Sequence, residues 1–207
     1  VGVMKMDEQN YILESEKKVL DIIGLPESLP RREINAVGII GAGTMGGGIA
    51  MNFANVGIPA HIIETSQDQL DKGIFNISNN YERSVNRGKV SKEEVTDRLK
   101  LISSSTQLTD LGQCDLIIEA VYEDLGLKKN IFKELDKIAG PFSILATNTS
   151  ALDINKIALG TLRPDDVIGL HFFSPANVMK LVEIVRAKFT SDVVVATSLS
   201  LVKKINK

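Results

Sequence analysis

The chain has 207 residues, of which 43% are hydrophobic and 24% charged, as is typical of a soluble globular protein. Its formal net charge is −2 and its basic residues are scattered, so the composition indicates no nucleic-acid partner. The single cysteine, Cys114, excludes an internal disulfide framework and indicates a reducing, intracellular compartment. No apolar run approaches the ~20 residues that a membrane-spanning helix requires. We expect neither a membrane span nor a metal site.

Residues 1–33 precede the first clear strand and contain one amphipathic candidate helix, over residues 14–23. Gly24, Pro26 and Pro30 then interrupt any regular element. Nothing in this segment matches a catalytic or binding pattern. We therefore expect a linker or a short docking helix.

The next stretch begins with an apolar run, residues 34–40, which is too short for an ordinary helix and is typical of a buried parallel strand. Gly41, Gly43 and Gly46 follow in the G-x-G-x-x-G spacing. The first glycine permits a sharp turn, the second lets backbone N–H groups approach a pyrophosphate, and the third lets the next helix pack closely. That helix is predicted over residues 44–56, and its N-terminal N–H groups would face the phosphates.

A second apolar run, residues 60–63, ends in Glu64. An acidic side chain at this distance from the glycine motif can accept hydrogen bonds from both ribose hydroxyls of an adenosine. It would also repel the 2′-phosphate of NADP, so the sequence favours NAD. Together, the strand, glycine turn, helix, second strand and acid predict a dinucleotide site; a glycine-rich turn that binds no nucleotide is the alternative.

Two charged helices are predicted after Glu64, over residues 66–87 and 91–99, the second opened by a capping box at Ser91. This helical excursion is longer than a simple crossover requires. Lys72 and Lys89 are its most prominent cations. From the residues alone, a solvated helix face is favoured over contact with a ligand.

Strands and helices alternate through the rest of the chain. Further strands are predicted over residues 101–103, 115–121, 143–147, 167–173 and 181–185, and further helices over 125–138, from 153, and over 191–205. This alternation predicts a Rossmann-type, doubly wound, mostly parallel sheet with helices on both faces. Ligands bind such sheets beyond the carboxyl ends of the strands, where Glu123, Ser150 and His171 also fall.

Of the two histidines, His61 lies inside a predicted strand and is interpreted as structural. His171 lies near a strand's carboxyl end beside two phenylalanines, where a neutral imidazole could take the proton of an alcohol while a hydride leaves the same carbon. Glu183 could return beside His171 across a hairpin and orient the ring. A pair of polar residues in the core is the alternative.

Four segments resemble the NAD-binding domain of the L-3-hydroxyacyl-CoA dehydrogenase family, which includes the dehydrogenase part of multifunctional fatty-acid β-oxidation enzymes. They are VGIIGAGTMGGGIA at 37–50, DLIIEAVYEDLGLKK at 115–129, ATNTSALDI at 146–154 and GLHFFSPANVMKLVEIV at 169–185. The resemblance covers residues 34–205, and the last two motifs are shared by few other dinucleotide-binding proteins.

The resemblance implies a role for each matching residue. His171 would be the general base in oxidation, Glu183 would pair with it, and Ser150 would hydrogen-bond the substrate's 3-hydroxyl or 3-keto oxygen. Asn177 would lie near nicotinamide and substrate, and Lys72 and Lys89 become candidates to bind coenzyme A. The residues expected at the NAD cofactor are Gly41, Ala42, Gly43, Thr44, Met45, Gly46, Glu64, Glu123, Lys128 and Asn148.

The family also sets expectations for the larger protein. Its members continue with a helical domain that closes the acyl pocket and forms the dimer, so we expect residues 34–207 to be a domain truncated before that part. Residues 1–33 loosely resemble a linker that follows a fused enoyl-CoA hydratase. The compartment would be peroxisomal or mitochondrial in a eukaryote and cytoplasmic in a bacterium.

The function implied is NAD-dependent oxidation of an L-3-hydroxyacyl-CoA thioester to the 3-ketoacyl-CoA, by an enzyme of which this piece alone would be inactive. A related dehydrogenase of free hydroxy acids is one alternative. An NAD-binding module without turnover is another, although it would have no use for Ser150, His171 and Glu183 together.

Overall fold

The computed structural model describes residues 10–15, 18, 24–26 and 28–207 and divides the chain into two compact units, Val1–Pro30 and Arg31–Lys207. In the first unit, residues 10–15 are helical. The amphipathic helix predicted over residues 14–23 lies largely outside the described residues.

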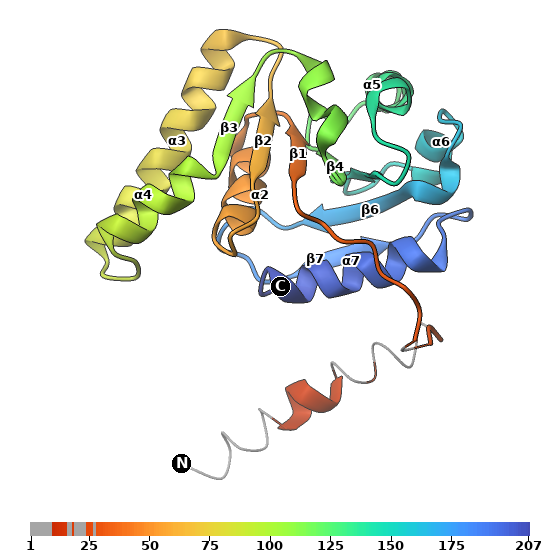
Figure 1. Cartoon of the computed structure of the whole chain (residues 1–207), viewed down its shortest axis with the longest axis horizontal. Helices are drawn as coiled ribbons and strands as arrows, with labels where there is room; N and C mark the ends of the chain where they lie inside the picture. The colour runs from red at the N-terminus through yellow and green to blue at the C-terminus, as the bar shows by residue number, and fades with distance from the viewer. Residues whose placement is uncertain (1–9, 16–17, 19–23, 27) are drawn as a thin grey trace. The chain divides into compact units, whose positions relative to one another are not determined.

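In the described part of the chain, seven strands form one sheet in the order β3-β2-β1-β4-β5-β6-β7 (Figure 1). Their bounds are β1 Val37–Ile40, β2 Ala60–Ile63, β3 Ile102–Ser105, β4 Leu116–Glu119, β5 Ile144–Thr147, β6 Val167–Phe172 and β7 Val182–Val185. Neighbouring strands from β3 to β6 pair in parallel, and β7 pairs antiparallel to β6. The strand order reverses between β1 and β4, as in a Rossmann fold, and this confirms the predicted fold class.

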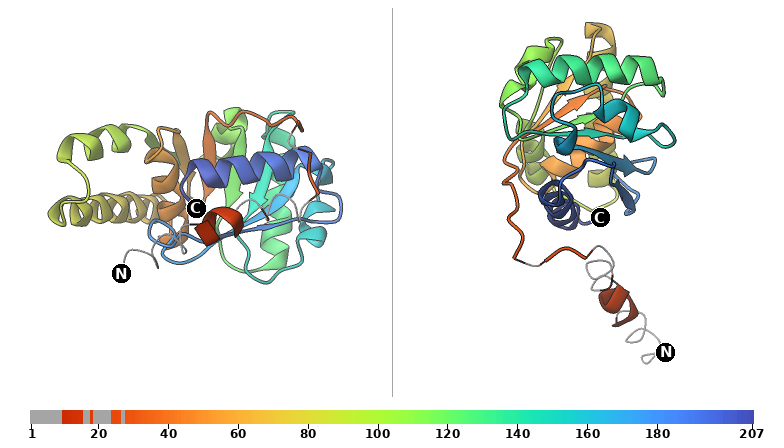
Figure 2. Two further views of the ribbon diagram at one scale, coloured as in Figure 1. Left: turned by 90° about the horizontal axis from the view of Figure 1, so that it is seen from below. Right: turned by 90° about the vertical axis from the view of Figure 1, so that its right-hand side faces the viewer.

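Helices cover both faces of the sheet, and Figure 2 shows α5 and α7 on opposite sides of it. The helices are α2 Thr44–Ala54, α3 Gln67–Asn86, α4 Lys92–Lys100, α5 Leu125–Ile138, α6 Ile154–Ala158 and α7 Asp192–Lys204, with 3-10 turns η1 Leu108–Gln113 and η2 Pro164–Asp166. Polar caps fix several helix starts, since Ser91, Asp124, Asp153 and Ser191 each accept a backbone N–H of the first turn. None of the described helices is long and apolar enough to cross a membrane.

The core lies on both faces of the strands. On the face covered by α5 and α6, buried side chains that include Ile117, Phe132 and Leu145 form one apolar cluster. Cys114 belongs to this cluster, and burial raises the pKa of its thiol to about 11, so the thiol stays protonated at neutral pH. It packs as a small apolar side chain.

The predicted helical excursion is formed by α3 and α4, which run side by side beyond the edge of the sheet (Figures 1 and 2). The excursion approaches the glycine-rich turn most closely at Gly73 of α3, which lies against Ala42. A Cβ atom at Gly73 would lie 2.4 Å from the carbonyl oxygen of Ala42. Helix α3 therefore lies so close to the glycine-rich turn that only a glycine fits at position 73.

Candidate active site

The glycine-rich turn between β1 and α2 leaves open space at one of its three glycines. Gly41 has φ +106°, and a Cβ at Gly46 would lie 1.8 Å from the carbonyl oxygen of Gly41, so both positions require glycine. At Gly43, by contrast, a Cβ would meet no protein atom within 4 Å. Because the fold itself does not require this glycine, the space beside it suits a pyrophosphate at the start of α2.

Glu64 follows β2 and reaches back to this turn. Its Oε2 accepts the backbone N–H of Ala42 at 3.1 Å, and its Oε1 accepts that of Thr65 at 2.8 Å. The carboxylate thus lies beside the phosphate end of the site, where hydroxyls of a ribose could reach it. The backbone N–H groups at the start of α2 as donors, and the Glu64 carboxylate as acceptor, fit an adenosine dinucleotide.

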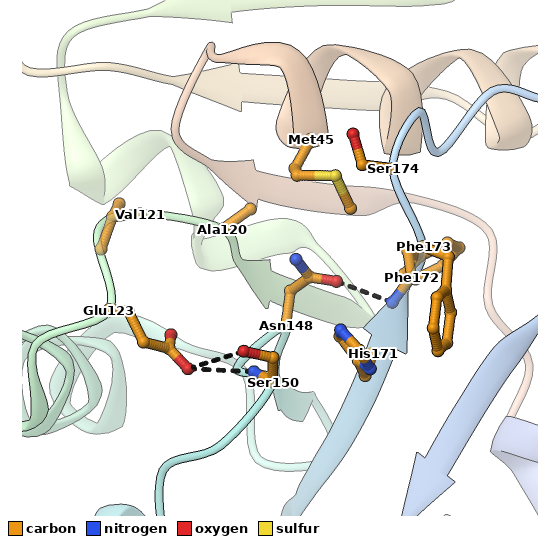
Figure 3. A pocket seen from close by; sticks show the side chains of 10 residues that line it. All are labelled: Met45, Ala120, Val121, Glu123, Asn148, Ser150, His171, Phe172, Phe173 and Ser174. Carbon is orange, nitrogen blue, oxygen red and sulfur yellow. Dashed lines mark hydrogen bonds between the residues drawn. The ribbon is translucent and has the colours of Figure 1, made fainter. Parts of the chain in front are cut away.

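A cavity of about 290 Å³ opens between the start of α2 and the ends of β4, β5 and β6 (Figure 3). It is lined by Met45, Ala120, Val121, Glu123, Asn148, Ser150, His171, Phe172, Phe173 and Ser174. The predicted reacting groups Ser150 and His171 therefore share one pocket with the cofactor turn.

His171 and Glu183 face each other across the β6–β7 pair. The Nδ1–H of His171 donates to Oε2 of Glu183 at 2.8 Å. The imidazole is mostly buried and packs against the ring of Phe173, with 4.6 Å between the ring centroids. Since the carboxylate fixes Nδ1 as the donor, Nε2 is left as an acceptor, and the described residues provide no hydrogen-bond partner for it.

Glu123 holds the loop that carries Ser150. Its Oε1 accepts the backbone N–H groups of Ser150 at 3.0 Å and Ala151 at 3.2 Å, and also the hydroxyl of Thr149 (Figure 3 shows the bonds to Ser150). Partial burial acts to raise the pKa of Glu123. The hydrogen bonds from Thr149 and Ser150 and the charge of Lys128 outweigh burial, so the pKa is lowered and the carboxylate stays ionised.

Lys128, expected near the cofactor, lies beneath the pocket with its side chain 1% exposed. Its ammonium is 2.6 Å from Oε1 of Glu119 and 3.4 Å from Oε2 of Glu123. Glu119 is fully buried at the end of β4 and was not among the predicted site residues, because it lies inside the apolar run predicted as a strand over residues 115–121. The sequence did contain one signal for it: a charged residue inside a buried apolar strand needs a polar partner.

The remaining predicted residues, Asn148, Asn177, Lys72 and Lys89, lie at separate places in the fold. Asn148 joins β5 to β6, since its Oδ1 accepts the backbone N–H of Phe172 at 2.8 Å. Asn177 lies outside the cavity lining, with its backbone against Gly48 of α2. Lys72 is exposed near the start of α3, and Lys89 is exposed in the turn after its end, so most of the helix, about 20 Å, separates them. They cannot bind the same phosphate group.

His61 lies away from the pocket and contacts β3. Its Nδ1 is 2.6 Å from the hydroxyl of Ser103, and its Nε2 is 3.3 Å from that of Ser105. Burial lowers the pKa of His61. Among the described residues, no group of three or more histidine, cysteine, aspartate or glutamate side chains is placed to hold a metal ion.

The strand order, the open glycine turn and the acid after β2 define a Rossmann domain that binds NAD. His171, which pairs with Glu183, lines the adjoining pocket. The chain belongs to the family described as 3-hydroxyacyl-CoA dehydrogenase, NAD binding domain, whose model matches residues 36–207. Its cofactor is NAD.

Among known proteins, the chain is 44% identical over 169 residues to a 3-hydroxybutyryl-CoA dehydrogenase of Clostridioides difficile, covering 82% of this chain and 60% of that protein. It is 43% identical over 176 residues to a peroxisomal bifunctional enzyme of Cavia porcellus, covering 85% and 24%. A solved (S)-3-hydroxybutyryl-CoA dehydrogenase from Ralstonia eutropha superposes with a TM-score of 0.83 at 39% identity, covering 84% and 62%. The chain thus spans between about a quarter and three fifths of these relatives.

Proposed function

We propose that this chain carries the cofactor site and the proton-handling pair of an NAD-dependent 3-hydroxyacyl-CoA dehydrogenase. The observation that carries the proposal is the 2.8 Å bond from His171 to Glu183, since His171 lines one pocket with Ser150 and with Met45 of the glycine-rich turn. The reaction is oxidation of L-3-hydroxyacyl-CoA to 3-ketoacyl-CoA.

In this mechanism His171 takes the hydroxyl proton of the substrate at Nε2. Its Nδ1–H already donates to Glu183, so the imidazolium that forms is stabilised by the carboxylate at 2.8 Å. NAD, when bound, supplies the carbon that accepts the hydride from C3 of the substrate. In the reverse direction His171 returns the proton to the 3-keto oxygen.

Ser150 holds the reacting oxygen. Its backbone and hydroxyl are both tied to Glu123, with 3.4 Å between Ser150 Oγ and Glu123 Oε1, so the side chain is oriented before substrate arrives. The rings of Phe172 and Phe173 line the same pocket and limit the access of water to His171.

The substrate class is proposed to be a coenzyme A thioester rather than a free acid. The names of the relatives support this choice, and the α3–α4 excursion beside the glycine-rich turn supplies surface beyond what NAD needs. The test is NADH oxidation by the full-length polypeptide with acetoacetyl-CoA or with free acetoacetate. We expect kcat/KM to be at least ~100-fold higher for the thioester, because contacts remote from the reacting carbon contribute to transition-state binding. Equal rates would favour a free hydroxy-acid dehydrogenase.

The acyl pocket and dimer contacts are proposed to lie in a C-terminal helical domain beyond this chain, and a hydratase is proposed to precede it in a fused enzyme. The peroxisomal names of several relatives support a peroxisomal location in a eukaryotic host. A mitochondrial or bacterial cytoplasmic location stays a prediction of the sequence.

A further inference from the structure

The loop between β6 and β7, residues 173–181, joins the two strands that carry His171 and Glu183. Ser174 of this loop lines the candidate active site together with Met45 at the start of α2 (Figure 3). The position of the loop relative to α2 therefore determines how wide the pocket is between the glycine-rich turn and His171.

The loop packs directly against the backbone of α2. Ala176 is completely buried, and a Cβ atom at Gly48 of α2 would lie 3.1 Å from its Cβ, so a glycine at this point lets the loop approach the helix closely. The backbone N–H groups of Val178 and Met179 both donate to the carbonyl oxygen of Pro175, at 2.9 and 3.0 Å. These two bonds give the loop a defined shape where it meets α2.

One carbonyl oxygen of the loop, that of Ala176, accepts side-chain donors from two other parts of the fold. The Nδ2 group of Asn52, a buried residue of α2, donates to it at 2.9 Å. The ammonium of Lys207, which follows α7, donates to it at 2.7 Å and also donates to the carbonyl oxygen of Met179. The loop is thereby tied at one atom both to the cofactor helix and to the end of α7.

The placement of Lys207 has a cost for the fold. Burial lowers its pKa, which means that this site disfavours the ammonium. Among the described residues, its Nζ group has carbonyl oxygens as hydrogen-bond partners and no carboxylate. An apolar side chain at this position would avoid the cost but could not bind the loop. Control of the loop therefore accounts for this lysine better than stability does.

We propose that Asn52 and Lys207 are positioning residues for the reaction. By holding the carbonyl oxygen of Ala176, they fix the loop against α2 and so fix His171 relative to the cofactor-binding end of that helix. The consequence for proton and hydride transfer rests on the proposed function. The position of the loop does not.

The first test is hydrogen exchange on the full-length polypeptide with Asn52→Leu and, separately, with Lys207→Met. Each change leaves the shared carbonyl oxygen with its other donor, so both variants should fold. We expect the amides of Val178 and Met179 to exchange about tenfold faster in each variant, with the amides of α5 unchanged. Lys204→Met, at an exposed position in the last turn of α7, is the matched control and should change neither.

The second test is turnover of acetoacetyl-CoA and NADH by the same variants, expressed per NADH-binding site counted by fluorescence titration. This normalisation removes any loss of folded protein, so a residue that only stabilised the fold would leave the value unchanged. We expect kcat per site to fall about tenfold in each single variant and about 100-fold in the double variant, because a misplacement of about 1 Å is enough for such losses. The dissociation constant of NADH should stay within about threefold, since Glu64 and the glycine-rich turn are untouched.

The proposal is overturned if either single variant turns over per NADH site like Lys204→Met, or if turnover falls while exchange of the loop amides does not change. Because the two residues belong to different parts of the fold, a failure of one variant to fold leaves the other as the test. Should the wild-type protein turn over no 3-ketoacyl-CoA, the proposed function fails instead. The exchange of Val178 and Met179 then still decides whether Asn52 and Lys207 hold the loop.

Discussion

At the scale of single residues, two carboxylates organise the pocket by holding two different polar groups. Glu183 orients the ring of His171, and Glu123 holds the loop of Ser150. Both carboxylates belong to the protein itself, so neither hydrogen bond depends on a ligand. In the proposed mechanism these groups therefore need little rearrangement before the chemical step, which is pre-organisation for catalysis.

Glu183→Gln tests the first of these carboxylates. The amide keeps the size of the side chain but removes the charge that stabilises the imidazolium of His171, so we expect kcat/KM for acetoacetyl-CoA to fall about 100-fold. NADH binding should be unchanged. Steady-state rates with fluorescence titration of NADH measure both. Glu82→Gln, an exposed position on α3, serves as the control, and equal rates in the two variants would rule out the role of Glu183.

The pairing of His171 with Glu183 could be predicted from the sequence, because the two residues lie on adjacent strand candidates with period-two spacing. Glu119 and Lys128 could not be paired in this way. They are nine positions apart on a strand and a helix, and only the packing of α5 against the sheet brings the ammonium under the strand end. The contact between Lys128 and Glu119 is therefore known from the structure alone, and the expected place of Lys128 near the cofactor stays a prediction.

At the scale of elements, the β1–turn–α2 unit determines where the cofactor can bind. Its three glycines have different reasons to be glycine. Gly41 and Gly46 are required by the backbone itself, whereas the space at Gly43 is free of protein atoms. The same motif therefore contains both a folding requirement and a binding requirement.

Alanine at Gly43 and at Gly46 should separate these two requirements. Gly43 has φ −69°, which alanine adopts without strain, so Gly43→Ala should keep the wild-type Tm and bind NADH at least ~10-fold more weakly. Gly46→Ala places a Cβ 1.8 Å from a backbone oxygen and should cost more than ~3 kcal/mol of unfolding free energy. Thermal melting and fluorescence titration distinguish them. Normal NADH binding by a folded Gly43→Ala variant would contradict the assigned phosphate position.

Hydrophobic pattern and glycine spacing were enough to predict the element order, but not all the bounds. The first strand, expected over residues 34–40, begins at Val37. The backbone N–H groups of Asn35 and Ala36 instead donate to the side chain of Asp115. Such side-chain competition for backbone groups is invisible to periodicity.

At the scale of the whole molecule, stability at high pH depends on a tyrosine far from the pocket. Tyr81 of α3 is buried and donates its hydroxyl to Asn55 Oδ1 at 3.0 Å. Burial raises its pKa from 10.0 to about 12, with the charge of Arg98 acting in the opposite direction. The folded state therefore favours the neutral phenol. This contribution is fully present below pH 10 and is lost as the pH rises toward 12.

Tyr81→Phe should consequently be less stable than wild type at pH 8 by about 1 kcal/mol, the value of the lost hydrogen bond. Wild type should then lose about 2 kcal/mol relative to the variant between pH 10 and pH 12, so that the order reverses. Urea unfolding of both proteins at several pH values measures this difference in unfolding free energy. Tyr122→Phe, at a position 86% exposed, should run parallel to wild type, and a constant gap for Tyr81→Phe would contradict the account.

The central claim is that His171 handles the proton of a 3-hydroxyacyl-CoA reaction on an NAD-binding Rossmann domain. The most direct measurement is acetoacetyl-CoA-dependent loss of NADH absorbance by the full-length polypeptide, with His171→Ala beside it. We predict turnover by wild type and a loss of ~100- to 10,000-fold in the variant, which should still quench NADH fluorescence. A protein that binds NADH but consumes none with any 3-ketoacyl-CoA, or a variant as fast as wild type, would contradict the claim.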